Sequence, residues 1–498
     1  MKEVLSINLG QCGIQVASCF WEMLANAVRT CSDKPTLDVE QVSSYFSDTN
    51  DNLTSDKMSA ANREDYMSTL KARCILVDTD LGTISEILQR QHLHHIDSGN
   101  IVCGTEATGN NWSTAYCNYG PQYHEAMEEL LSTNLEICDE SFQYFNLIFG
   151  LAGGTGAGLG SYVLDLLSDE YGKVPRVCNV ITEGTMAAVS PYNTVFCLKH
   201  LNDLSSITNL FSNEALSQQK IESSEQELLN TLKSKPSKEI GFNHENGLIS
   251  SHLKEFGLAT VSKNYPGFNM RSILNTLIPL PGLNLTCPSM APKNIINEGA
   301  TTETLINELV RPSNRISPIP QKIKSAPIAM AIHGRFNNDS FKYIKRLKLK
   351  HNMVGWNRDA VKISLPGVNY TEDASTKYGG MYGITNDSSI SPFLQTSLSN
   401  FDRLYSKRAF WHHYSDVFGE DDFSTAREHI ERLRADYETT SNFMMPPPHL
   451  LNETSLASLG VKVNNLSDKA CTDVWNETPG IIESNKQYWW SLNGSPLW

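Results

Sequence analysis

Five glycines lie within eight residues, from Gly153 to Gly160, where a short apolar run gives way to a helical pattern. Glycine lets backbone N–H groups turn toward a ligand, and a helix N-terminus adds partial positive charge, so the segment suits a phosphate group. A P-loop is excluded because no lysine follows these glycines until Lys173. The dinucleotide fingerprint also fails, because Leu159 stands three residues after Gly156. A connector that binds no ligand is the alternative, although five glycines add to the entropy cost of folding.

Two further loops follow apolar strands in the same half of the chain. A turn at 10–13 follows the strand expected at 4–9, and the pair Asp78 and Asp80 follows the strand expected at 72–77. Strands alternating with helices favour a parallel sheet, whose carboxyl edge binds ligands. The three loops are therefore expected to converge. Further strands are expected at 145–149 and 176–182, and helices at 14–28 and 159–171.

Composition excludes several classes of protein. The chain has 498 residues, which corresponds to roughly three domains at about 150 residues each. Its formal charge of −14 argues against a general binder of nucleic acids or anionic membranes. Its 11 cysteines are scattered singly, which is typical of reduced thiols in a cytosolic protein. No signal peptide is expected, because MKEVLSINLG alternates like a strand and carries an acid at position 3. No membrane span is expected, because no apolar run reaches the roughly 18 residues that a span needs.

Six motifs in order carry a resemblance to a known family. GGTGAGLGS (153–161) resembles the signature phosphate loop of tubulins. The resemblance implies an α/β fold with a Rossmann-type parallel-sheet GTP-binding domain, a second α/β intermediate domain and C-terminal helices. The other five motifs are LGQCGIQV (9–16), ILVDTDLG (75–82), TGNNWSTAY (108–116), SPYNT (190–194) and NEAL (213–216).

The same resemblance, together with composition, places the domains. The GTP-binding domain is expected at 1–247 with a polar insertion at about 217–241, the core helix and intermediate domain at 248–392, the C-terminal helices at 393–440 and a tail at 441–498. In this second half, helices are expected at 248–262, 401–414 and 425–437, and strands at 274–285, 328–333 and 361–365.

The resemblance also implies a site for GTP or GDP with Mg²⁺. Carboxylates suit Mg²⁺, and an asparagine amide can pair with a guanine edge. Helix capping is the alternative for the aspartate pair, and core packing is the alternative for the aromatic residue at the base. The implied residues are Gly10, Gln11 and Cys12 under the phosphates, Gly109 and Asn110 near the γ-phosphate, Gly153, Gly154, Thr155 and Gly156 around the phosphates, Asn213 and Asn246 as guanine readers, Phe242 stacked on the base, and Asp78 and Asp80 for Mg²⁺.

Departures from the family pattern bear on hydrolysis. Met186 and Ser190 stand where family members carry acids, and Ser272 occupies the position of the catalytic glutamate of alpha chains. The segment 265–274 holds no acid. A missing general base costs about 10²–10⁴-fold in rate. We therefore expect that this face activates no partner's GTP, and that any weak GTPase activity depends on a partner subunit. GTP held permanently as a structural ligand is the alternative.

The tail and several segments look like the epsilon branch of the family. From 443 to 498 the chain carries five acids and three bases, unlike the densely acidic tails of alpha and beta chains. SPYN, the polar insertion, VGWNRDAVKISL (354–365) and RLYSKRAFWHHY (403–414) also resemble that branch. The resemblance implies a cytoskeletal protein of centrioles or basal bodies that helps to build doublet or triplet microtubules in ciliated cells. Expected partners are alpha, beta or delta-type tubulins and centriole or basal-body proteins.

Other interpretations stay open beside this one. A delta-like or divergent lattice tubulin, including a protist isotype, is the alternative within the family. A nucleotide-dependent small-molecule enzyme on a Rossmann-like fold is the alternative from another class. His92, His94 and His95 lack cysteine support for a metal site and are expected on the surface. The basic segment 341–351 is expected to be a solvated helix face, with contact to an acidic tubulin tail as the alternative.

Overall fold

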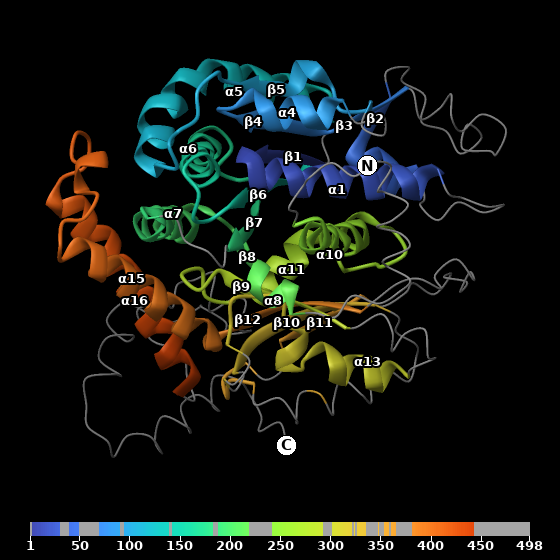
Figure 1. Cartoon of the computed structure of the whole chain (residues 1–498). Helices are drawn as coiled ribbons and strands as arrows, with labels where there is room; N and C mark the ends of the chain where they lie inside the picture. Colours follow the sequence, from blue (N-terminus) through green and yellow to red (C-terminus); the bar gives the residue numbers. More distant parts are fainter. Residues whose placement is uncertain are drawn as a thin grey trace, which may run out of the picture.

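One ten-stranded sheet runs through both halves of the chain (Figure 1). Across it the strands follow the order β11-β10-β12-β9-β8-β7-β6-β1-β4-β5. A separate antiparallel pair consists of β2 (Phe46–Asp48) and β3 (Leu70–Ala72). The computed structural model describes residues 2–29, 39–48, 69–89, 94–138, 142–182, 188–218, 242–291, 301–320, 323, 326–334, 347, 353–357, 360–364 and 381–442.

The N-terminal half of the sheet is parallel throughout, as the alternation of strands and helices predicts. Helices cover both of its faces, so its strands are near-continuous apolar runs. The four strands expected in this half are confirmed as β1 (Glu3–Leu9), β4 (Cys74–Asp78), β6 (Phe142–Gly150) and β7 (Arg176–Thr182). Two further strands, β5 (Ile101–Cys103) and β8 (Ile207–Ser212), complete this half.

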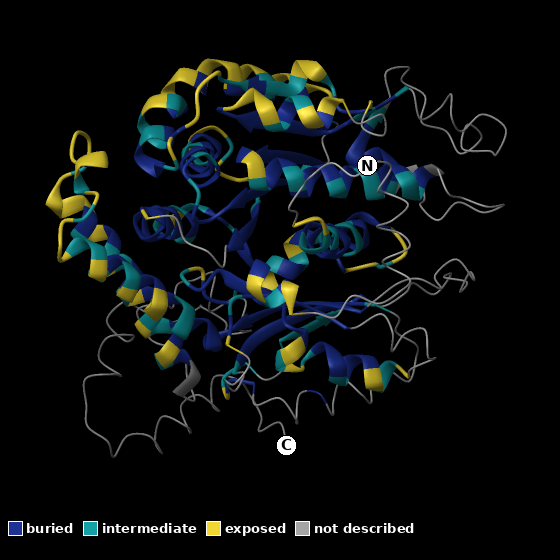
Figure 2. Ribbon diagram, in the orientation of Figure 1, coloured by how far each residue is buried: buried dark blue, intermediate teal, exposed yellow. Residues whose placement is uncertain are grey.

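Two helical layers enclose two separate apolar cores, one on each face of the sheet (Figures 1 and 2). The first layer consists of α5 (Gly120–Glu136), α6 (Thr155–Glu170), α7 (Ser190–Leu204), α15 (Ser391–Tyr405) and α16 (Glu420–Asn442). The second consists of α1 (Gly10–Arg29), α4 (Leu81–Leu88), α10 (Asn243–Val261) and α11 (Met270–Leu277), with the short helices α2 (Val39–Tyr45) and α8 (Asn213–Ser217) beside them.

The C-terminal half continues the sheet in a mixed arrangement. β9 (Leu285–Met290) is parallel to β8 and antiparallel to β12 (Tyr382–Asp387). β10 (Pro327–His333) is antiparallel to β12 and parallel to β11 (Val361–Ile363), so the strands expected at 328–333 and 361–365 are confirmed. α13 (Thr302–Leu309) packs with β10 around a third, smaller apolar cluster.

The strand expected at 274–285 is wrong. Its first part belongs to α11 and its last residue begins β9. α11 forms because Asn269 caps it, with Oδ1 accepting the Ser272 N–H at 2.9 Å. The apolar residues of this stretch therefore follow helical spacing, and Ile273 and Leu277 pack into the core.

The helix expected over 401–414 is also wrong beyond Tyr405. Arg408 and Phe410 adopt left-handed φ values of 48° and 58°, which end the helix without a glycine. The surface position expected for His95 is wrong as well, because this ring is fully buried and lies edge-on to Phe46 at 5.7 Å.

Several predictions lie outside the described residues. These are the insertion from 219 to 241, the basic segment 341–351 apart from Leu347, and the tail from 443. The domain boundaries stay predictions. Among the described helices, none combines the length and apolar character that crossing a membrane requires.

A ladder of buried polar side chains crosses five neighbouring strands. Asn146 on β6 donates to the Ser6 hydroxyl on β1 at 3.1 Å, and Asn179 on β7 donates to Asn146 Oδ1 at 2.7 Å. Asn209 on β8 donates to Asn179 Oδ1 at 2.8 Å, and the Thr286 hydroxyl on β9 donates to Asn209 Oδ1 at 2.7 Å. The last rung joins the two halves of the sheet.

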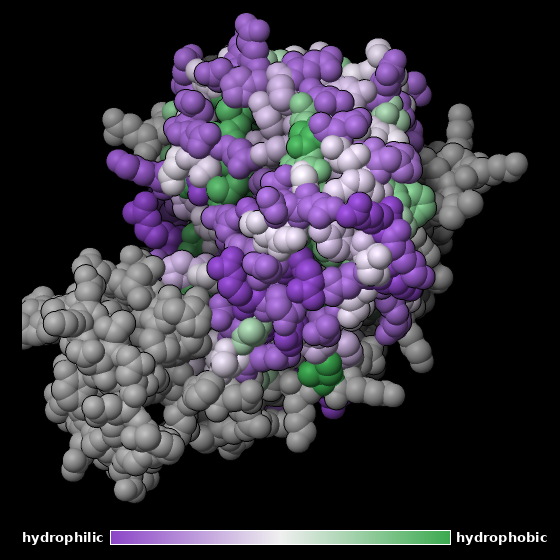
Figure 3. Space-filling model, turned by 90° about the vertical axis from the view of Figure 1, so that its left-hand side faces the viewer, coloured by the Kyte–Doolittle hydropathy of each residue, from purple (hydrophilic) through white to green (hydrophobic). Residues whose placement is uncertain are grey.

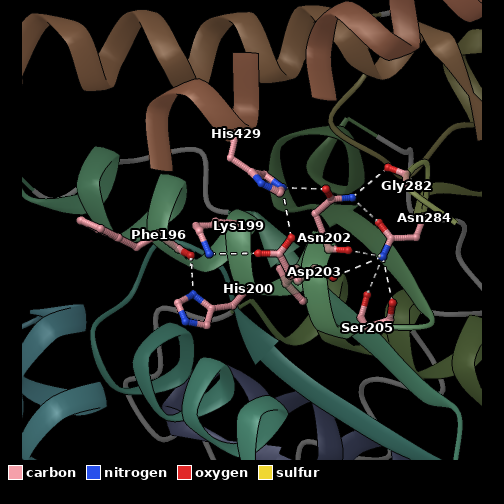
Figure 4. Close-up of polar contacts among 10 residues, drawn as sticks. Phe196, Lys199, His200, Asn202, Asp203, Ser205, Gly282, Asn284 and His429 are labelled. Atoms are coloured by element: carbon pink, nitrogen blue, oxygen red, sulfur yellow. Dashed lines mark hydrogen bonds and ion pairs between the residues drawn. The ribbon is translucent and has the colours of Figure 1, made fainter. Parts of the chain in front are cut away.

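A polar cluster on α7 joins α16 on one side and the turn before β9 on the other (Figure 4). The Asn202 amide on α7 donates to the Gly282 carbonyl and to Asn284 Oδ1, at 3.0 and 2.9 Å. His429 Nε2 on α16 lies 2.8 Å from Asn202 Oδ1 and 3.6 Å from Asp203 Oδ1. The side of the molecule that carries α15 and α16 is mostly hydrophilic, with scattered apolar residues (Figure 3).

Candidate nucleotide-binding site

The turn after β1 packs directly against the glycine-rich loop. Gly10 has a φ of +66°, and a Cβ at this position would come within 2.8 Å of the Gly156 nitrogen. Only glycine satisfies both the backbone and this close approach. α1 begins at Gly10, so Gln11 is exposed and Cys12 half-buried in its first turn rather than in a separate turn. The expected convergence of these two loops is confirmed.

The loop before α6 is tightly packed at one glycine and open at the next. A Cβ on Gly154 would come within 2.4 Å of the Asn111 nitrogen, whereas one on Gly153 would meet nothing closer than 3.8 Å. α6 begins at Thr155 without a side-chain cap. Because the first N–H groups of a helix have no intrahelical partner, this end offers backbone donors to an anion.

Three threonine hydroxyls converge beside this loop. Thr155 Oγ1 lies 3.1 Å from Thr79 Oγ1 and 3.0 Å from Thr108 Oγ1. Thr79 follows β4 and Thr108 follows β5, so the cluster joins the ends of neighbouring strands to α6. Hydroxyls donate and accept, which suits phosphate oxygens or water. The sequence did not single out Thr79 or Thr108, although both lie inside quoted motifs.

The loop 108–112 contains two successive residues in the left-handed region. Gly109 has a φ of 60° and is exposed, and Asn110 has a φ of 61°. Asn110 Oδ1 accepts the Gly154 N–H at 2.9 Å, and this bond joins the loop to the glycine-rich segment. Left-handed backbone is costly for residues other than glycine and persists where surrounding contacts hold it.

The two aspartates after β4 have different roles. Asp80 caps α4 through an Oδ1 that accepts the Gly82 N–H at 3.0 Å, so the capping alternative is confirmed for this residue. Asp78 is buried, and its Oδ1 accepts the Thr79 N–H at 2.8 Å while its Oδ2 has no hydrogen-bond partner. Burial raises the pKa of Asp78 to about 6.

The donor set at Asp78 fits Mg²⁺ that arrives with a nucleotide. Mg²⁺ keeps several waters and is bound by one or two carboxylates together with phosphates, so it needs no large protein cage. Within the described ranges, no three His, Cys, Asp or Glu side chains gather into such a cage. Asp80 can join a water shell and keep its cap on α4, because only Oδ1 accepts the Gly82 N–H and the exposed carboxylate has a second oxygen.

The residues expected to recognise the base lie on another part of the sheet edge, after β8 and on α10. Asn213 is buried at the start of α8, and its Oδ1 has no partner. Asn246 is buried on α10, which packs against α8. Phe242, just before α10, is 51% exposed, so the core-packing alternative is wrong. An exposed ring remains available for stacking on a base.

The departures from the family pattern have distinct surroundings. Ser190 is buried at the start of α7, and its hydroxyl has no hydrogen-bond partner. Ser272 is half-buried in the first turn of α11, which carries no acid. Met186 lies outside the described residues.

Asn193 on α7 joins two of these loops, although its place in the sequence does not single it out. Asn193, within SPYNT, is fully buried and donates to the carbonyls of Asn110 and Ala152 at 2.9 and 3.0 Å. The motif was visible in the sequence. Its contacts were not, because they connect segments far apart in the chain.

Comparisons with known proteins agree with this geometry. Residues 3–220 match the Tubulin/FtsZ family, GTPase domain. The epsilon chain of mouse tubulin is 26% identical, covering 90% of this chain and 98% of its own. The human epsilon chain is also 26% identical, with 92% of this chain and 100% of its own covered. The gamma chain of Candida glabrata is 26% identical over 87% of this chain and 93% of its own.

Proposed function

Because this chain is a divergent, epsilon-like member of the tubulin family, we propose that it is a GTP-binding microtubule subunit that works at centrioles or basal bodies. The observation that carries the nucleotide part is a pair of buried oxygens without partners, Asp78 Oδ2 after β4 and Asn213 Oδ1 after β8. A guanine N–H donor satisfies the amide oxygen, and Mg²⁺ or one of its waters satisfies the carboxylate.

Each part of the edge has a role in this proposal. Gly10, Gly153 and Gly154 let backbone N–H groups approach the phosphates, and the hydroxyl of Thr155 lies beside them. Mg²⁺, when bound, neutralises phosphate charge. Asp78 is buried, so its carboxylate contacts an ordered water or the cation rather than bulk solvent. The exposed ring of Phe242 stacks on the base. The chain's own residues thus select a guanine nucleotide at one end and position its phosphates at the other.

The nucleotide part is tested by identifying what the purified chain carries. Denaturation followed by chromatography should release GTP or GDP, and a stripped chain should rebind fluorescent GTP that GDP displaces and ATP does not. NAD or another cofactor in the released fraction would instead support the small-molecule enzyme. A chain that carries and binds no guanine nucleotide contradicts the proposal.

The cellular part rests on the similarity to epsilon chains and on the tail. The segment from 443 to 498 carries five acids and three bases, so its charge differs from the densely acidic tails of alpha and beta chains. Its proposed partners are alpha, beta or delta-type tubulins and centriole or basal-body proteins. A tagged chain should concentrate at centrioles or basal bodies when bulk microtubules are stained alongside. Signal along all cytoplasmic or spindle microtubules would identify a divergent lattice tubulin instead.

A further inference from the structure

Asn193 lies between the nucleotide loops and a C-terminal segment. Its Nδ2 donates to the carbonyls of Asn110 and Ala152, at 2.9 and 3.0 Å. Its Oδ1 accepts the Trp112 N–H at 3.0 Å and the Tyr414 hydroxyl. The amide thus uses both donors and both lone pairs, and only this orientation satisfies two carbonyls and a backbone N–H together.

On its inner side, Asn193 holds the loop that approaches the phosphates. The carbonyl it binds belongs to Asn110, one of the two left-handed residues of the loop 108–112. The side chain of Asn110 binds the Gly154 N–H, so the same residue touches the glycine-rich segment. A change in this loop on nucleotide binding therefore acts on the Asn193 amide.

On its outer side, Asn193 holds the segment 409–414 between α15 and α16. Besides the Tyr414 bond, Asn111 Nδ2 donates to the His413 carbonyl at 2.8 Å. The Tyr192 hydroxyl on α7 donates to the Ala409 carbonyl at 3.0 Å. The segment is thus fixed to α7 and to the nucleotide loop at three places along its length.

Ring stacking supports the same connection. The Trp112 ring stacks on Phe196 at 5.0 Å with an interplanar angle of 15°. Phe196 in turn stacks on Tyr414 at 6.1 Å and 16°. Trp112 and Tyr414 are both fully buried, so neither ring shifts without its neighbour.

The outer surface of this segment faces solvent. Phe410, His412 and His413 are exposed, and Phe410 has a left-handed φ of 58°. A partner that contacts this surface therefore acts on backbone that is joined to the phosphate loop through two amides, that of Asn193 and that of Asn111.

We propose that Asn193 is a positioning residue that couples the loop 108–112 to the segment 409–414. Nucleotide bound at the loop and a contact on the outer segment then influence each other, and this influence is reciprocal. The inference rests on the proposed GTP site and adds a connection from that site to the exposed segment 409–414.

Hydrogen exchange measured by mass spectrometry tests the coupling in the full chain. Wild type should exchange more slowly in both 108–112 and 409–414 with GTP than without nucleotide. Asn193→Ala should exchange faster in 108–112 even without nucleotide, and GTP should slow 409–414 clearly less than in wild type, because only the Asn111 bond still joins the two segments directly. Its preference for GTP over GDP should change about fivefold or more.

Two further variants keep the test decisive. Tyr414→Phe removes one hydroxyl and leaves the Asn111 and Tyr192 bonds in place. It should weaken the response of 409–414 while GTP still slows 108–112, so it decides the matter where Asn193→Ala does not fold. Asn202→Ala is the matched control, because Asn202 lies on the same helix and loses a comparable set of bonds to Gly282, Asn284 and His429 (Figure 4). It should keep both responses.

The outcomes separate the two proposals. A wild-type chain that binds no guanine nucleotide contradicts the GTP site itself. A chain that binds GTP but shows no change at 409–414 overturns the coupling alone. The coupling is also overturned where Asn193→Ala and Tyr414→Phe respond as wild type does, or where Asn202→Ala loses the response equally.

Discussion

At the scale of single residues, the sheet edge separates side chains that are fully hydrogen-bonded from side chains that are not. Asn193 uses all four of its bonding positions, whereas Asn213 and Asp78 each keep a buried oxygen without a partner. A buried polar atom without a partner costs about 1–3 kcal/mol. The saturated residue is therefore part of the scaffold, and the two unsaturated residues are the ones that gain from a ligand.

Replacing Asn213 by alanine should weaken guanine nucleotide binding about 10- to 100-fold, because one good hydrogen bond to a base is lost. The affinity for ATP, which should be weak in wild type and in Asn213→Ala alike, should not change. Titration of stripped chain with fluorescent GTP measures the change. Ser217→Ala, an exposed position on the same helix, is the control and should bind as wild type does. Equal affinity of Asn213→Ala and wild type would place the base elsewhere.

Replacing Asp78 by asparagine should remove most of the Mg²⁺ dependence of GTP affinity, since the buried carboxylate is lost while its shape is kept. Binding measured with Mg²⁺ and with a chelator gives the two values to compare. Asp97→Asn, which alters a helix cap that accepts the Gly99 N–H at 2.9 Å, is the control. A variant that retains the full Mg²⁺ effect would mean that Asp78 has no part in holding the cation.

At the scale of elements, the polar ladder accounts for part of the register of the sheet. Asn179 stands in its centre and contacts Asn146 and Asn209. Asn179→Ala leaves one acceptor and one donor unpaired in the core and should lower the free energy of unfolding by about 2–4 kcal/mol. Thr286→Val leaves one buried acceptor, Asn209 Oδ1, without this donor and should cost about 1–2 kcal/mol. Urea unfolding gives both values, and equal losses would contradict the prediction, because the loss of two rungs should cost more than the loss of one.

The sequence predicted the parallel strands well and their connections less well. β1, β4, β6 and β7 are buried on both faces, so their apolar runs mark them directly. α11 was mistaken for a strand because its apolar residues lie between prolines, although Asn269 three residues before Ser272 is a cap signal. The end of α15 was missed because non-glycine residues make the left-handed turn.

The candidate site likewise contains residues that the sequence predicts and residues that it does not. The glycines and aspartates were predictable, because each follows an apolar strand and carries a backbone or charge requirement of its own. Thr79, Thr108 and Asn193 were not, because their importance comes from contacts between segments that are 41 to 83 residues apart. Spacing along the chain holds no record of such contacts.

At the scale of the whole molecule, two buried histidines should make stability depend on pH. Burial lowers the pKa of both His252 and His333 to about 4, below the ordinary value of 6.5. Both are then neutral in the folded chain between these values but protonated in the unfolded chain. The free energy of unfolding should therefore fall as pH drops from about 6.5 toward 4, by up to about 1.4 kcal/mol per unit for each histidine.

Chemical unfolding at a series of pH values checks this slope. His252→Gln and His333→Gln should each flatten it, whereas the exposed His412→Gln should not. Glu255, which acts against the lowering at His333, should be left intact in these variants. An unchanged slope in both histidine variants would assign the acid sensitivity to carboxylates.

Assembly should reveal the consequence of Ser272. The first turn of α11 carries no acid, so a partner that docks its nucleotide on this face should turn over GTP about 10²–10⁴-fold more slowly than on an acidic face. Ser272→Glu should restore part of the rate, and Thr276→Glu, one turn later, should not. Release of phosphate from a GTP-loaded partner measures the rate, and fast turnover on the wild-type face would contradict the prediction.

The continuity of the sheet has a mechanical consequence. Only two residue positions pair across the seam between β8 and β9, Thr208 with Leu285 and Asn209 with Thr286. Two strands that pair over so short a length resist bending less than the longer pairs on either side, so a force that bends the sheet acts mainly between β8 and β9. The Tyr437 hydroxyl of α16, bound to Leu285 at 3.0 Å, and the Asn202 bonds brace that seam from outside. The sheet should therefore bend most easily where β8 pairs with β9, and the contact from α16 limits that bending.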